Sequence, residues 1–171
     1  MTSMTSPSFR QLAAFTVPSE PGNERLALAQ VATAVAGEGL SPARLERLKT
    51  AVAEAAMNAI EHGNRNQPEV PVDVEVTAAD GDIVVTITDQ GGAPEEASPG
   101  AEPDLAAKLA GEQPPRGWGL FLIRHMVDAM DVTTEGTRHT VRLVMRAASR
   151  GGAPDGGAAE AEEGGPRENH V

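Results

Sequence analysis

Two polar side chains, Glu54 and Asn58, stand four positions apart in a segment whose apolar residues recur at helical spacing. Residues four apart share one face of a helix, so the two groups are expected to point into the same space. The side-chain oxygen of an Asn is a hard ligand suited to Mg²⁺, and a nearby Glu can accept a proton from an attacking hydroxyl group. Taken alone, such a pair is more typical of the solvated face of a surface helix. Glu61 is interpreted as a residue of such a face and is assigned no function.

A second acidic group ends an apolar segment, where Asp89 follows residues 83–88 and precedes Gly91 and Gly92. A carboxylate at a strand end can accept a hydrogen bond from an exocyclic amine such as that of adenine, and the glycines let the backbone approach a ring. Asp and Gly are also common turn formers. The segment is therefore open to two interpretations, a ligand-binding edge or a plain turn.

A third segment combines glycines with a positive charge, in the order Arg116, Gly117, Trp118, Gly119. Glycines let the backbone approach phosphates, and the helix expected after them offers free N–H groups and the positive end of its dipole. Arg116 could meet a phosphate. The alternative is a flexible joint before a helix, and Trp118 could cover a nucleotide or pack on the neighbouring loop. The Walker pattern Gly-x-x-x-x-Gly-Lys-[Ser/Thr] is absent.

Helices and strands are expected on both sides of these segments. Ser41 and Pro42 suit the start of the helix that carries Glu54, and Gly63 can end that helix in a left-handed conformation. The sequence around Asp80 indicates a hairpin. This order of elements predicts an α+β two-layer sandwich, with helices on one face of a mostly antiparallel sheet. The expected strands cover residues 9–17, 70–76, 83–88, 132–134 and 140–145, and the expected helices cover residues 24–36, 41–61 and 120–130.

The remaining segments are expected to lie outside the sandwich. One domain is predicted over residues 9–147. Residues 1–8 are expected to be flexible, and the Gly- and Glu-rich residues 148–171 are expected to form a disordered acidic tail. Residues 90–115 form a long polar insert, which predicts a functional lid or a disordered loop. A short helix is expected inside it at residues 104–109.

The composition narrows the class of protein. The 171 residues are 40% hydrophobic but only 2% aromatic, so aliphatic side chains must build the core. A net charge of -11 argues against nucleic acid as a partner, because phosphates require a basic face. The absence of Cys excludes disulfides and Cys-ligated zinc. No apolar run is long enough for a membrane span, and no secretory signal pattern is present, so a cytoplasmic protein is expected.

In this order, the three segments resemble the nucleotide pocket of the Bergerat type, which histidine kinases, DNA gyrase B, heat-shock chaperones and MutL-like ATPases share. Within this GHKL superfamily, the chain is similar to the small bacterial anti-sigma-factor serine/threonine kinases from about residue 9 to residue 147. The similarity is densest in residues 54–64 and 116–124. The resemblance implies a histidine-kinase-like ATPase fold that binds ATP and Mg²⁺.

The resemblance also assigns roles to individual residues. It implies that Glu54 is the general base and that Asn58 is the Mg²⁺ ligand. It implies that Asp89, together with Gly91, binds the adenine, and that Thr140 lies on a strand near the same ring. The residues implied on the phosphate side are Arg116, Gly117 and Gly119.

The implied activity is that of an ATP:protein phosphotransferase. Its substrate is a serine or threonine of a STAS-domain anti-sigma antagonist, and it regulates a sigma factor by partner switching. A serine phosphatase that opposes the kinase and a homodimeric state are implied as well. An alternative is a nucleotide-gated binding module that sequesters a sigma factor or an antagonist with little or no transfer. The long insert and Ala93, where the family often has glycine, favour this alternative.

Overall fold

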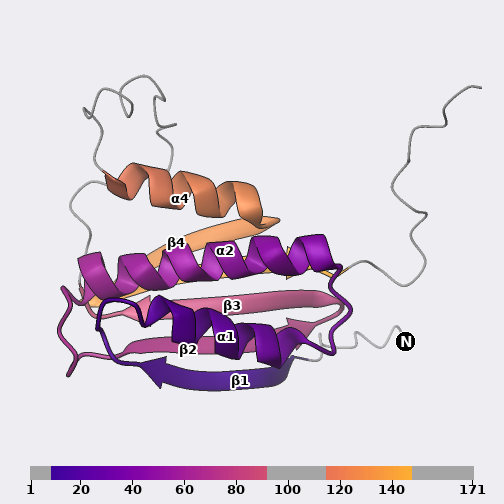
Figure 1. The fold of residues 1–171 in the computed structure, drawn as a ribbon, viewed down its shortest axis with the longest axis horizontal. Coiled ribbons are helices and arrows are strands. Elements are labelled where there is room, and N and C mark those ends of the chain that lie inside the picture. Colours follow the sequence, from indigo (N-terminus) through magenta and orange to yellow (C-terminus); the bar gives the residue numbers. More distant parts are fainter. Residues whose placement is uncertain (1–8, 92–114, 148–171) are drawn as a thin grey trace, which may run out of the picture.

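The computed structural model describes residues 9–91 and 115–147, with the backbone alone for residues 115–118. The predicted flexible N-terminus, the short helix predicted at residues 104–109 and the predicted acidic tail lie outside this part of the chain. The described residues form a five-stranded sheet with the helices on one face (Figure 1). The elements are β1 (Arg10–Val17), α1 (Glu24–Val35), α2 (Pro42–Asn58), η1 (Ala59–Gly63), β2 (Val72–Ala79), β3 (Asp82–Asp89), α4 (Pro115–Met126), β4 (Ala129–Glu135) and β5 (Arg138–Arg146).

Every neighbouring pair of strands is antiparallel, in the order β1-β2-β3-β5-β4. The predicted α+β sandwich is therefore confirmed. The predicted hairpin between β2 and β3 turns at Asp80 and Gly81, whose φ angles are 49° and 87°, as a tight two-residue turn requires. β4 and β5 are longer than predicted, because their ladder continues through polar residues as far as the pair Glu135 and Arg138.

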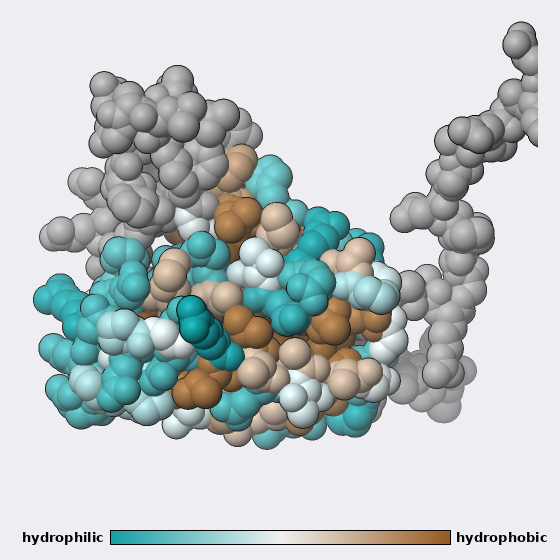
Figure 2. All heavy atoms as spheres, viewed as in Figure 1, coloured by the Kyte–Doolittle hydropathy of each residue, from teal (hydrophilic) through white to brown (hydrophobic). Residues whose placement is uncertain are grey.

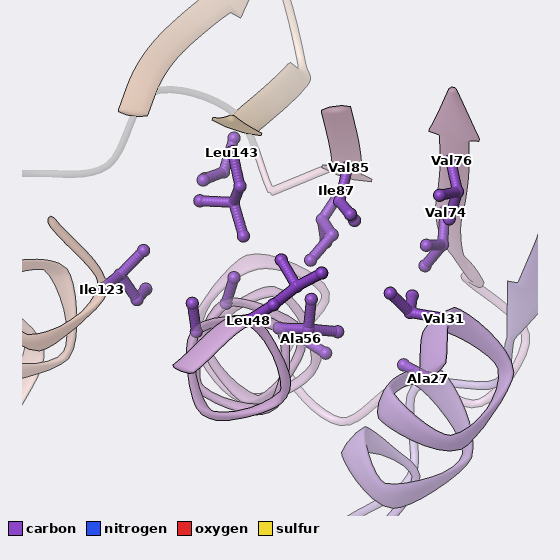
Figure 3. Close-up of a cluster of buried hydrophobic side chains, with 14 of the residues drawn as sticks. Ala27, Val31, Leu48, Ala56, Val74, Val76, Val85, Ile87, Ile123 and Leu143 are labelled. Carbon is purple, nitrogen blue, oxygen red and sulfur yellow. The ribbon is translucent and has the colours of Figure 1, made fainter. Parts of the chain in front are cut away.

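The hydrophobic core lies between the sheet and the helices. Alternate residues of each strand point toward the helical layer, and α2 lies in its centre (Figure 3). Ala51, Ala55 and Ala56 of α2 are at most 2% exposed, so small side chains let this helix approach the sheet closely. The core residues labelled in Figure 3 are Ala27 and Val31 of α1, Leu48 and Ala56 of α2, Ile123 of α4, Val74 and Val76 of β2, Val85 and Ile87 of β3, and Leu143 of β5.

The helix predicted at residues 120–130 is shifted toward the N-terminus. α4 already begins at Pro115, so Gly117 and Gly119 lie inside the helix instead of before it. Pro suits the first helical position because its φ is fixed at a helical value. Gly lowers helix propensity by about 1 kcal/mol relative to Ala, and for this reason the sequence pattern places the helix after the glycines. The helix ends early because the backbone N–H of Asp128 is hydrogen-bonded to β5.

The end of α2 also differs from the expectation. α2 continues into the π-helical turn η1, which ends at Gly63. Gly63 is not left-handed; in the loop directly after it, the residues with positive φ are Arg65 at 53° and Asn66 at 55°. The prediction that Gly63 is a left-handed helix stop is therefore wrong. Its lack of a side chain instead permits a close contact with the carboxyl group of Asp89.

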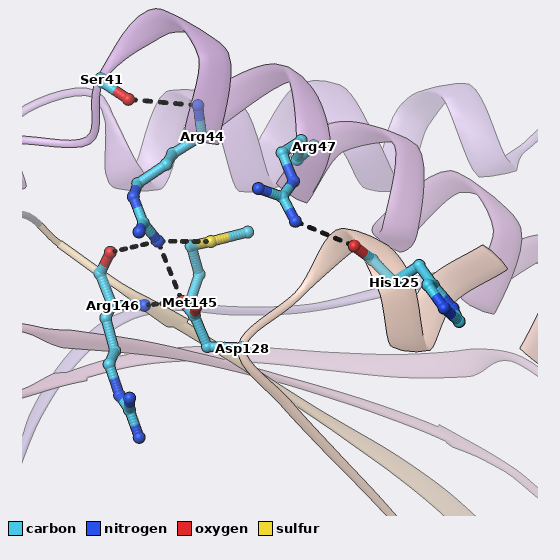
Figure 4. Close-up of polar contacts among 7 residues, drawn as sticks. All are labelled: Ser41, Arg44, Arg47, His125, Asp128, Met145 and Arg146. Atoms are coloured by element: carbon cyan, nitrogen blue, oxygen red, sulfur yellow. Dashed lines mark hydrogen bonds and ion pairs between the residues drawn. The ribbon is translucent and has the colours of Figure 1, made fainter. Parts of the chain in front are cut away.

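Polar contacts fix the C-terminal end of α4 to the N-terminal end of α2 (Figure 4). The guanidinium of Arg47 donates to the carbonyl oxygen of His125 at 2.9 Å. Arg44 donates to Asp128 Oδ2 at 3.0 Å and to the carbonyl oxygen of Arg146 at 3.2 Å. Asp128 Oδ2 also accepts the backbone N–H of Arg146 at 2.7 Å. Because α2 and α4 run in opposite directions (Figure 1), this anchor places the beginning of α4 over the end of α2.

The helix-covered side of the molecule has a mixed surface. Figure 2 shows hydrophilic residues gathered at the left, where α2 ends, and apolar patches nearer the centre. Among the described residues, the large exposed apolar side chains are Phe9, Leu26 and Val132. Within residues 9–91 and 115–147, no helix combines the length and the apolar character needed to cross a lipid bilayer.

The substitution Leu48→Ala tests the central place of α2. Leu48 is completely buried, so its truncation is expected to destabilise the protein by about 2–5 kcal/mol. The matched control is Leu26→Ala in α1, because Leu26 is 51% exposed and its loss should change stability by no more than about 0.5 kcal/mol. Urea unfolding measures both variants. Equal losses at the two sites would contradict the arrangement of the core.

Candidate functional site

Glu54 and Asn58 lie in the last turns of α2, as predicted, and both are half-buried. Their neighbours on the adjacent helix face, Ala55 and Ala56, are buried against the sheet. Among the described residues, none makes a hydrogen bond or ion pair with the side chain of Glu54 or Asn58. Polar groups that are partly withdrawn from water usually have a partner. The pair is therefore a set of oxygen and nitrogen atoms available to a ligand.

Gly119 of α4 packs directly on this pair. A Cβ atom added at Gly119 would lie 2.9 Å from Asn58 Nδ2 and 3.3 Å from Glu54 Oε2. A larger residue would displace the Asn58 side chain, so glycine permits this close crossing of the two helices. The first and third sequence segments therefore meet. The other predicted phosphate-side residues, Arg116 and Gly117, lie in the first turn of α4, and their side-chain positions are outside the described structure.

Asp89 occupies the end of β3 and is 4% exposed. Its Oδ1 accepts the backbone N–H of Gly91 at 2.9 Å, and its Oδ2 lies 3.0 Å from His139 Nδ1. Gly63 lies so close that a Cβ atom there would overlap the carboxyl group of Asp89. A Cβ atom at Gly91 would in turn overlap the backbone of Gly63. Gly63 of η1, Asp89 of β3 and Gly91 just after β3 therefore pack against one another and form one corner of the fold.

The strand register decides which β5 residue lies beside Asp89. His139 is its cross-strand partner, whereas Thr140 is paired with Thr88. The hydroxyl groups of Thr88 and Thr140 are 3.1 Å apart. Since successive strand residues point to opposite faces, Thr140 lies on the face away from the helices, and His139 lies on the face of Asp89. The structure thus brings His139, and not Thr140, to the carboxylate.

A buried amide, Asn64, connects the loops around this corner. It is 4% exposed, and its Nδ2 donates to Ser19 Oγ and to the carbonyl oxygen of Val70, both at 3.0 Å. Its Oδ1 accepts the backbone N–H of Gln90 at 2.8 Å. Asn64 is not among the site residues predicted from the sequence, because a polar residue after a helix is typical of an ordinary solvated loop. Its position directly after Gly63 was the available signal.

The predicted site residues therefore form two clusters joined by η1. One cluster contains Glu54, Asn58 and Gly119, and the other contains Asp89 and Gly91. In the described part of the chain, no three His, Cys, Asp or Glu side chains gather into a metal-binding cluster. Mg²⁺ needs few protein ligands, because it keeps several waters and binds substrate phosphates. The amide oxygen of Asn58, which has no hydrogen-bond partner within residues 9–91 and 115–147 as described, lies beside a carboxylate, and this donor set fits Mg²⁺.

The sequence matches the histidine kinase-like ATPase domain over residues 17–145. The chain belongs to this family. Its relatives include the anti-sigma F factor of Oceanobacillus iheyensis, at 32% identity over 69% of this chain and 81% of the relative. The anti-sigma F factor of Geobacillus stearothermophilus is 30% identical over 73% of this chain and 84% of the relative. The matched range contains all three sequence segments.

A solved structure confirms the fold. The crystal structure of the RsbU and RsbW domains of Rv1364c from Mycobacterium tuberculosis matches with a TM-score of 0.56 and 19% identity. The match covers 83% of this chain and 32% of that longer chain. The predicted Bergerat-type sandwich is thus shown by the family match and by the arrangement of the strands and helices. The roles assigned to individual site residues stay predictions.

The substitution Gly63→Ala tests the corner around Asp89. The added methyl group would overlap the carboxyl group, and overpacking of this kind costs about 1–3 kcal/mol. The matched control is Gly37→Ala, because nothing lies within 4 Å of a Cβ atom at Gly37, and its stability should change by no more than about 1 kcal/mol. Urea unfolding and calorimetric titration with ADP measure stability and binding. If the Gly63→Ala protein were destabilised but bound ADP with unchanged affinity, the corner would not be part of the nucleotide-binding site.

Proposed function

We propose that this protein is an ATP-dependent serine/threonine kinase that phosphorylates a STAS-domain anti-sigma antagonist and regulates a sigma factor by partner switching. The observation that carries the proposal is the half-buried Glu54–Asn58 pair, which has no partner among the described side chains and lies under Gly119 of α4. The printed names of the relatives, anti-sigma F factor, support the proposed partner class. The match to a structure with an RsbW domain supports the fold for this role.

The base and phosphate ends of ATP have separate places in this proposal. At the end of the sheet, the carboxylate of Asp89 accepts a hydrogen bond from the exocyclic amine of adenine, and Gly91 lies against the ring. The phosphates lie toward the start of α4, where the first N–H groups after Pro115 lack acceptors within the helix. The helix dipole favours negative charge at this end, and Arg116 is placed in the same turn. Base and phosphate contacts are thus joined by η1 and the end of α2.

The transfer step uses the polar pair on α2. Asn58 Oδ1 would hold Mg²⁺, which when bound neutralises charge on the phosphate oxygens. The Glu54 carboxylate takes the proton from the substrate serine or threonine. The hydroxyl oxygen then forms its bond to the γ-phosphorus while the bond to the β-phosphate oxygen breaks, and ADP leaves. Because phosphoryl transfer depends mainly on positioning and charge stabilisation, Asn58 is expected to matter as much as Glu54.

Further partners follow from the same proposal. A serine phosphatase removes the phosphate from the antagonist, so that the antagonist can return to its unmodified state. The protein acts as a homodimer, and its net charge of -11 disfavours direct contact with nucleic acid. The phosphatase and the homodimeric state rest on the resemblance of the three sequence segments to the anti-sigma-factor kinases.

A nucleotide-gated binding module is the second candidate. The close packing of Gly119 on Asn58 and Glu54 favours it, because a nucleotide that binds the pair would also act on the adjoining turn of α4. In this candidate, the nucleotide changes the position of α4 and thereby the affinity for a sigma factor or antagonist. Little or no phosphate is transferred.

A transfer assay with γ-labelled ATP, Mg²⁺ and candidate STAS-domain proteins separates the two candidates. Glu54→Gln removes the base but not the volume of the side chain, and transfer is expected to fall by about 10²–10⁴-fold with the ADP affinity retained. The matched control is Glu61→Gln, because Glu61 is exposed on η1, and its transfer rate should not change. Asn58→Ala is expected to abolish both transfer and Mg²⁺-dependent binding.

Full transfer by a folded Asn58→Ala protein would contradict the kinase mechanism. Nucleotide-dependent retention of a STAS-domain protein without label would support the binding module instead.

A further inference from the structure

The carboxylate of Asp89 is held on both sides by the protein. His139 Nδ1 lies 3.0 Å from Oδ2, and the side chains of His139 and Asp89 are 16% and 5% exposed. The backbone N–H of Gly91 donates to Oδ1 at 2.9 Å. The two residues are direct partners in the β3–β5 ladder. The strand pairing therefore holds them next to each other, unlike two flexible side chains on the surface.

The chemistry of the contact assigns the hydrogen atom. An ionised carboxylate can only accept hydrogen bonds, so Nδ1 of His139 is the donor. In a neutral imidazole, Nε2 then has a free lone pair. With one donor on each oxygen and Gly63 packed against the group, the plane of the Asp89 carboxylate is fixed. Its remaining lone pairs therefore point in one defined direction.

We propose that His139 is a positioning residue for nucleobase selection: it holds the Asp89 carboxylate as a fixed hydrogen-bond acceptor and thereby favours 6-amino purines over 6-oxo purines. The inference rests on the proposed nucleotide site and adds a residue to it. An amine at purine position 6 donates to the fixed oxygen. A carbonyl oxygen at that position faces another acceptor, which leaves a polar group unpaired and loses affinity.

Loss of the donor at His139 loosens this selection. A carboxylate held on one oxygen only can turn about its terminal bond, and its acceptor is no longer fixed opposite the amine. The affinity for the amino purine then falls, and the rejection of the oxo purine weakens. A purely structural role would lower the affinity for both nucleotides by the same factor, so the ratio of the two affinities separates the two roles.

The test compares ADP with IDP, which carries a carbonyl at position 6, by calorimetric titration of the full chain. His139→Leu removes the donor, and the ratio of ADP to IDP affinity is expected to fall by about fivefold or more. His139→Asn places an amide N–H near the position of Nδ1 and is expected to restore most of the ratio. The control is His125→Leu, because the His125 side chain contacts its own helix at Phe121, and the ratio should stay at the wild-type value.

Each result decides a different question. An unchanged ratio in a folded His139→Leu protein would overturn the role of His139 while leaving the nucleotide site intact. A ratio lowered equally in the Asn and Leu variants would also overturn it, because the donor would not matter. A wild-type protein that binds neither nucleotide would overturn the proposed nucleotide site itself, and the inference with it.

Discussion

The contact between Gly63 and the carboxyl group of Asp89 sets how the helical layer meets the end of the sheet. Any side chain at Gly63 would occupy the space of that carboxyl group, and Gly91 packs against the backbone of Gly63. The π-helical turn η1 carries Gly63 to this position, and such turns are frequently found at functional sites. The buried carboxylate of Asp89 therefore lies where the end of β3 meets η1, and the glycines leave room beside it for backbone.

This corner is stabilised by an amide and not by apolar packing alone. Asn64 is buried, yet it bonds to Ser19, to Val70 and to the backbone of Gln90. An unpaired buried polar group costs about 1–3 kcal/mol, so the arrangement is specific: a shift of any one loop would leave polar atoms unsatisfied. The backbone of Gln90 adjoins Asp89, and Asn64 adjoins Gly63. The amide thus holds both sides of the contact in place.

α4 is fixed at one end and meets the site at the other. Arg44 and Arg47 bond to groups at or just beyond its C-terminal end, whereas its N-terminal part rests on Asn58 through Gly119. A helix anchored in this way can respond to a ligand at its beginning without losing its attachment to the core. The same geometry serves both proposed functions, because phosphate binding and control of a partner would each act at the N-terminal end of α4.

The sequence predicted what depends on local patterns and missed what depends on pairing across the sheet. Helical spacing placed Glu54 and Asn58 on one face, and that placement is confirmed in α2. The start of α4 was missed because local propensity opposes glycine in a helix, whereas close packing on α2 requires it at Gly119.

The neighbour of Asp89 depends on the β3–β5 register, which no local pattern contains. Alternation within β5 narrows the choice, however: His139 shares its parity with the apolar residues that face the core, whereas Thr140 does not. Combining that parity with the antiparallel pairing of β3 selects His139 as the group that the carboxylate meets.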